Sequence, residues 1–170
     1  MIKILGFIII VAASTKIGFD LSEKYSKRTK ELRALISVLE RVVNEISFSN
    51  CIISDALISG CNVRIKTISD MIKYISITVK EKSLSLTEAF DCYLKTNNEL
   101  SLNSKDVDEV FKFFSMFGSG DREDEIKNIN NAILNIKSNL KNAIDDEKRY
   151  VKLFKTSGVL AGFLIAIILA

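Results

Sequence analysis

Two apolar segments, one near each end, constrain this chain more than any other feature. The first holds an uninterrupted apolar run from Ile4 to Ala13, and the last carries no charge from Ser157 to Ala170. A fourteen-residue helix is about 21 Å long, which is shorter than the roughly 30 Å hydrocarbon core of a bilayer. A soluble helix of that length needs a polar face, which the last segment lacks. Both segments therefore predict membrane spans, lengthened by flanking lysines that reach the headgroups.

Small residues recur three to four positions apart in the last segment. Gly158, Ala161 and Gly162 are followed by Ala166 at the same kind of interval. Small side chains allow two helices to approach closely in lipid. We therefore expect Gly158, Ala161 and Gly162 to pack the last span against the first or against a partner span.

Basic residues flank both apolar segments on the side of the middle of the chain, and basic flanks remain in the cytoplasm. They are Lys16, Lys24, Lys27, Arg28, Lys30 and Arg33, and then Lys141, Lys148, Arg149, Lys152 and Lys155. This asymmetry predicts spans at 1–19 and 156–170, a cytoplasmic domain at 20–155, and both termini on the far side. The alternative is a cleaved signal peptide ending at Val11-Ala12-Ala13, which would make the chain an exported helical binding protein with a C-terminal membrane anchor.

The middle of the chain predicts an all-α fold. Apolar residues recur at intervals of three and four in two long stretches, and the chain contains no proline to interrupt a helix. We expect a bundle of about six helices whose two long outer helices are antiparallel and continuous with the spans. The two outer helices should pack against each other through Leu32, Leu39, Ile46, Ile129, Ile136 and Leu140.

Shorter helices are expected between the outer two. One is predicted over Cys51–Gly60 and another after Ser85, which forms a capping box with Glu88. A glycine turn at Phe117–Gly120 should precede the last helix and lie far from the bilayer.

Residues that could carry chemistry are scarce. The chain has no histidine, and its three cysteines, Cys51, Cys61 and Cys92, have no metal-site spacing. The net charge of +3 is too small to indicate nucleic-acid binding. We therefore expect no enzyme activity, no metal and no cofactor. The acids that follow Gly118 suit the dipole at a helix start and could also dock a basic partner, and they are Asp121, Glu123, Asp124 and Glu125.

A further set of residues, spread along the whole chain, matches a known family. In the opening helix they are Tyr25, Arg28, Leu32, Arg33, Leu35, Leu39, Glu40, Glu45, Ile46 and Phe48. The later matches are SDALISG, Phe117-Gly118, Asp121-Arg122, Ile126, Lys152-Leu153-Phe154, Gly158-Val159-Leu160 and Gly162. Together these residues resemble the stage III sporulation protein AB family, which usually has proline at the position of Thr29.

The resemblance implies a role in sporulation. The family is similar to the inner-membrane platform proteins of type II secretion and type IV pilus machines, and its members belong to a channel assembly between mother cell and forespore. The expected location is the mother-cell (outer forespore) membrane. The expected partners are a cytoplasmic secretion-type ATPase resembling stage III sporulation protein AA, other channel subunits, and further copies of the chain. We hypothesise that Glu123 and Glu125 help to dock the ATPase.

Overall fold

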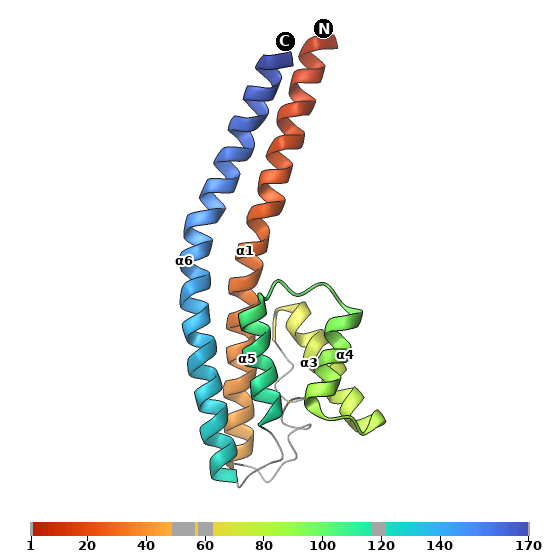
Figure 1. Ribbon diagram of the computed structural model, residues 1–170, viewed down its shortest axis with the longest axis vertical. Helices are drawn as coiled ribbons and strands as arrows, with labels where there is room; N and C mark the ends of the chain where they lie inside the picture. Colours follow the sequence, from red (N-terminus) through yellow and green to blue (C-terminus); the bar gives the residue numbers. More distant parts are fainter. Residues whose placement is uncertain (1, 49–56, 58–62, 117–121, 170) are drawn as a thin grey trace. The chain divides into compact units, whose positions relative to one another are not determined.

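The computed structural model describes residues 2–48, 57, 63–116 and 122–169, and all its regular elements are helices (Figure 1). They are α1 (Ile2–Phe48), α3 (Lys66–Lys82), α4 (Leu86–Thr96), α5 (Ser104–Ser115) and α6 (Arg122–Leu169). The all-α prediction is confirmed. The sixth expected helix, Cys51–Gly60, lies outside the described residues except for Leu57, which is buried.

The chain divides into two compact units, and both long helices contribute to each of them. The terminal unit contains residues 1–29 and 142–170, and the central unit contains residues 30–141. The domain boundaries expected from the sequence remain a prediction.

In the central unit, the apolar stripes of α1 and α6 are buried. Leu39 is 2% exposed and Ile136 is fully buried, whereas Leu134 on the other side of α6 is 64% exposed. Of the six residues expected to pack the two outer helices against each other, five are buried and Leu140 is half-buried; the buried ones are Leu32, Leu39, Ile46, Ile129 and Ile136. At the edge of α1 and α6, the Lys137 ammonium lies 2.9 Å from the Glu40 carboxylate.

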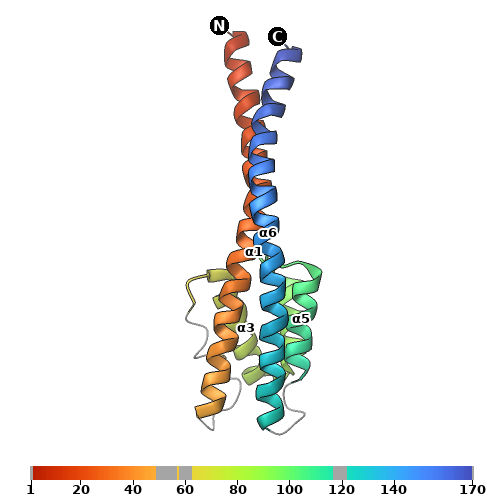
Figure 2. The same ribbon diagram turned by 90° about the vertical axis from the view of Figure 1, so that its left-hand side faces the viewer.

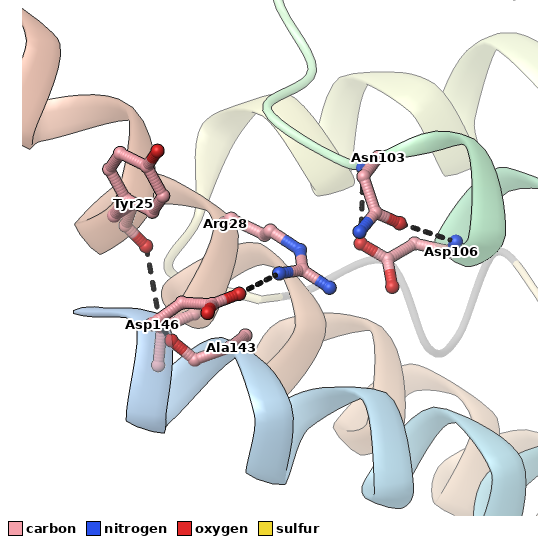
Figure 3. Close-up of polar contacts among 7 residues, drawn as sticks. Tyr25, Arg28, Asn103, Asp106, Ala143 and Asp146 are labelled. Atoms are coloured by element: carbon pink, nitrogen blue, oxygen red, sulfur yellow. Dashed lines mark hydrogen bonds and ion pairs between the residues drawn. The ribbon is translucent and has the colours of Figure 1, made fainter. Parts of the chain in front are cut away.

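Two of the three short helices of the central unit, α4 and α5, begin at capping boxes. The expected capping box at Ser85 is present, because its hydroxyl accepts a hydrogen bond from the Glu88 amide and the Glu88 carboxylate accepts one from the Ser85 amide. A second capping box starts α5, where Asn103 and Asp106 exchange the same pair of bonds at 2.9 and 3.0 Å (Figure 3). Such caps fix where each helix begins.

Aromatic rings join α4 to α5. The Phe90 ring centroid lies 4.8 Å from that of Phe111 and 5.5 Å from that of Phe114. Phe90 itself is fully buried. Aromatic pairs at these separations contribute beyond their buried area. One turn further along α4, Tyr93 packs against Tyr74 of α3 with the ring centroids 5.4 Å apart.

A buried carboxylate ties α1 to two other segments of the central unit. Glu31 is only 2% exposed. It accepts a hydrogen bond of 3.0 Å from the Thr67 hydroxyl on α3 and one of 2.7 Å from the backbone amide of Ser101. Because a buried charge is tolerated only when its lone pairs are satisfied, these bonds fix Glu31 and the two segments together.

A carboxylate on α5 joins that helix to α6. Glu109 accepts hydrogen bonds from the Lys112 ammonium at 2.7 Å and from the Asn135 side-chain amide at 2.9 Å. The pKa of Glu109 is lowered, chiefly because Lys112 donates to it, with a smaller contribution from Asn135, while partial burial opposes the shift. Because the pKa of Glu109 is lowered in the folded state, the bonds of its carboxylate to Lys112 and Asn135 stabilise the fold at neutral pH. This stabilisation is lost as pH falls through the folded-state pKa.

Replacing Leu39 by alanine should destabilise the central unit. A fully buried leucine leaves a cavity when it is truncated, so we expect Leu39→Ala to lower the free energy of unfolding by about 2–5 kcal/mol. Leu134→Ala removes the same atoms from an exposed position and should change it by less than about 0.5 kcal/mol. Denaturant unfolding of the detergent-solubilised chain, followed by circular dichroism, measures both. Equal stabilities for the two variants would show that Leu39 does not lie in the core.

Candidate functional site: the helix pair of the terminal unit

In the terminal unit, α1 and α6 lie side by side in both views (Figures 1 and 2). Three glycines, Gly18, Gly158 and Gly162, form a close backbone contact between the two helices. A Cβ atom added to Gly18 would lie 2.6 Å from the carbonyl oxygen of Phe154 and 3.1 Å from the Cα atom of Gly158. One added to Gly162 would lie 3.0 Å from the Cα atom of Val11. The two backbones are therefore too close to admit larger side chains at these positions.

A polar bond crosses the same contact. The Ser14 hydroxyl donates a hydrogen bond of 2.7 Å to the backbone carbonyl of Gly158. The absence of a side chain at Gly158 allows this approach, because a Cβ there would lie 3.0 Å from the Ser14 carbonyl oxygen. Inter-helix hydrogen bonds of this kind stabilise helix pairs in an apolar environment.

The small residues of α6 divide between two faces. Gly158 and Gly162 lie against α1, and Ala166, one turn further, is buried. Ala161, which the sequence grouped with the two glycines, is exposed and lies outside this contact. Adjacent helical residues differ by about 100° in direction, so Ala161 and Gly162 cannot share one narrow interface. Gly18 and Ser14 were not predicted, although both are small residues within or beside the first apolar segment.

Large apolar side chains cover the outside of this helix pair. Exposed residues occur on both helices, and they include Ile8, Ile9, Ile17, Leu160, Phe163, Leu164, Ile165, Ile167 and Ile168. Among the described residues, one helix, α6, is long and apolar enough to cross a membrane, and only 11% of its most apolar eighteen-residue window is buried. The exposed surface is of the kind that lipid covers. A span formed by the N-terminal segment stays a prediction.

Next to the apolar surface, the two helices are joined by stacked rings. The Tyr25 ring of α1 stacks on Tyr150 of α6 with the centroids 5.0 Å apart, and on Phe154 with the centroids 5.9 Å apart. All three side chains are half-buried. Tyrosines concentrate at membrane–water interfaces because the ring is apolar and the hydroxyl polar.

Polar contacts continue the pairing beyond the rings (Figure 3). Arg28 donates a hydrogen bond of 3.2 Å to the Asp146 carboxylate, and the Arg28 side chain is only 12% exposed. The buried hydroxyl of Thr29 lies 3.3 Å from both the Tyr25 and the Ala143 carbonyl oxygens, and can donate to either. The helix pair therefore changes from apolar, through aromatic, to charged contacts along its length.

The acidic cluster predicted at the start of α6 is only partly described. Glu123 and Asp124 are exposed and form no ion pair within the described part of the chain. Gly118 and Asp121 lie outside the described residues, as does the side chain of Glu125. The described residues contain no group of three or more metal-binding side chains. The site best defined by geometry is therefore the helix pair.

The comparisons with known proteins agree with the sequence resemblance. The family model for Stage III sporulation protein AB matches residues 3–170. A protein of that name from Bacillus subtilis (strain 168) is 26% identical over 170 residues, which cover 99% of each chain. A solved structure of Stage III sporulation protein AB (SpoIIIAB) shares the fold with a TM-score of 0.65 and 19% identity, over 72% of this chain and 98% of that one.

These findings define an all-helical protein with a candidate membrane-spanning helix in its C-terminal region. The chain belongs to the stage III sporulation protein AB family.

The glycine contact should tolerate no side chain at Gly18. Overpacking typically costs about 1–3 kcal/mol, and we expect Gly18→Ala to destabilise the detergent-solubilised chain by that amount. Gly6→Ala is the matched control, because nothing lies within 4 Å of a Cβ added there. Thermal unfolding followed by circular dichroism compares the two variants. A Gly18→Ala chain as stable as Gly6→Ala would contradict the close contact.

Proposed function

We propose that this chain is a membrane-anchored platform component of a secretion-like channel assembly between mother cell and forespore. It holds a helical domain in the cytoplasm and docks a secretion-type ATPase there, and it performs no catalysis itself. The observation that carries the proposal is that one chain contains two different units. The central unit is helical and carries charged side chains, whereas the helix pair of the terminal unit has an apolar outer surface. Membership of the sporulation family supports the biological setting.

The contacts of the first helix support an anchor that remains attached. Val11 packs on Gly162, and the Gly162 Cβ position would lie 3.1 Å from the Ser14 Cβ. If the chain were instead exported with a cleaved signal peptide, cleavage after Ala13 would remove Val11 and the preceding helical turns. It would expose the small-residue face of α6 around Gly162.

The start of α6 is the proposed docking surface for the ATPase. Acids in the first turn of a helix gain about 0.3–1 kcal/mol each from the helix dipole, but not all of them can cap the helix. Glu123 and Asp124 are exposed and without an ion-pair partner in the described residues. Both are therefore free to attract a basic surface, and such binding weakens with added salt.

Charge reversal at this surface tests the docking. We expect Glu123→Lys with Asp124→Lys to weaken ATPase binding by about tenfold or more at low salt. The variant should also lose about 1–4 kcal/mol of stability, because each reversal replaces a favourable interaction with the helix dipole by an unfavourable one of similar size, so binding is measured under conditions where the variant is folded. The matched control is Glu81→Lys with Asp108→Lys, which changes the net charge equally at two other exposed acids. Titration of the labelled chain with the purified ATPase at two salt concentrations measures the affinity.

Two results would contradict this placement of the site. One is unchanged ATPase affinity at low salt in the Glu123 and Asp124 variant. The other is an equal loss in the control, which would indicate a general effect of charge. If no affinity for the ATPase is measured with the unmodified chain, the platform function itself fails.

A further inference from the structure

Three lysines of α6 lie on one face of the terminal unit. Lys148, Lys152 and Lys155 are separated by four and three residues, so their directions differ by no more than about 60° around the helix. Lys148 and Lys152 are exposed and Lys155 is half-buried. These three residues are called the lysine stripe.

The charge of the lysine stripe is not neutralised by nearby acids on the same helix. Asp145, Asp146 and Glu147 precede it, and no acid follows Lys148 as far as Ala170. Asp146 is engaged by Arg28 at 3.2 Å. Lys148 and Lys152 form no ion pair within the part of the chain that the structure describes. The stripe therefore presents positive charge to whatever lies beside it.

An aromatic ring from α1 lies beside one end of the stripe. The Lys155 ammonium lies 4.8 Å from the centroid of the Phe19 ring, and Phe19 is 48% exposed. On α1, Glu23 is one turn from Phe19, and its carboxylate lies 3.2 Å from the Lys27 ammonium. Positive charge and an exposed apolar ring are thus combined at one place. Of the two nearby acids of α1, Glu23 is paired with Lys27, and Asp20, which follows Phe19 directly, is exposed and points about 100° away from it around the helix.

The position of the stripe corresponds to the headgroup layer of a bilayer. The charge-free segment of α6 begins two residues after Lys155, at Ser157. Lys148 to Lys155 covers about 10 Å of helix. The polar layer on each side of the hydrocarbon core is of comparable thickness, about 5–8 Å. A phosphate at that depth would lie beside the stripe, with its acyl chains against the apolar surface of the helix pair.

We propose that the lysine stripe and Phe19 form a site for the phosphate group of an anionic phospholipid in the cytoplasmic leaflet. The lysines attract the phosphate, and the Phe19 ring contacts the glycerol and upper acyl region. The inference rests on the proposed membrane anchoring of the terminal unit. A lipid fits better than an acidic protein, because the stripe directly adjoins the charge-free segment.

The test is a lipid titration of the full chain in an uncharged detergent, monitored by native mass spectrometry. The probes are short-chain phosphatidylglycerol and short-chain phosphatidylcholine. Each lysine near an anionic headgroup contributes about fivefold in affinity, so the three together contribute on the order of 100-fold. We expect the unmodified chain to bind phosphatidylglycerol at least about tenfold more tightly than phosphatidylcholine.

Two triple variants distinguish an effect of the lysine stripe on lipid preference from an effect of net charge. Lys148→Gln, Lys152→Gln and Lys155→Gln together should abolish the preference for phosphatidylglycerol. The control carries Lys66→Gln, Lys73→Gln and Lys105→Gln at exposed positions of the central unit, and should keep it. If the triple stripe variant does not fold, Lys152→Gln alone should lower the affinity about fivefold, because it leaves the Phe19 contact intact.

The proposal is overturned by a stripe variant that keeps the preference, or by an unmodified chain that shows none. It is also overturned if inorganic phosphate displaces phosphatidylglycerol at equal concentration, because the site would then bind a free anion. Carbonate extraction of membranes separates this inference from the proposed function. A chain that stays in the membrane without lipid preference contradicts only the lipid site, whereas a chain that is extracted contradicts the anchoring.

Discussion

The close backbone contact at Gly18, Gly158 and Gly162 is the constraint on which the terminal unit depends. It brings the two ends of a 170-residue chain together, and neither end segment of the terminal unit contains a cysteine. A large side chain at any of the three positions would separate the helices and lengthen the Ser14 hydrogen bond to α6. Because dispersion attraction falls steeply with distance, the stacking of Tyr25 on Tyr150 would weaken as well.

The chemistry of the helix pair changes in one direction, and this order of side chains suits the proposed membrane anchoring. Exposed isoleucines and leucines cover the glycine contact, tyrosines follow, and Arg28 with Asp146 completes the series. Apolar side chains suit the hydrocarbon core, tyrosines the interface, and ion pairs water. The lysines of α6 lie near the boundary between the apolar and charged regions, which is where anionic headgroups would be found.

Much of the fold could be predicted from local patterns. The three-four spacing identified the stripes that contain Leu39 and Ile136, and the Ser85–Glu88 pair identified the start of α4. Contacts between distant segments could not be predicted in this way. Nothing in the local sequence links Glu31 to the amide of Ser101, or Gly18 to Phe154, because these contacts depend on how helices are oriented. The same reason accounts for Ala161, whose spacing resembled that of the glycines although it is exposed.

The orientation of the chain in the membrane tests the central claim most directly. Reporter domains fused after Asn50 would show whether the central unit is cytoplasmic, and sequencing of the mature N-terminus would show whether the first segment is retained. The account predicts activity only from a reporter that works in the cytoplasm, with an N-terminus that precedes Ile4. Activity of an export-dependent reporter at Asn50, or a mature chain that begins at Ser14, would contradict it.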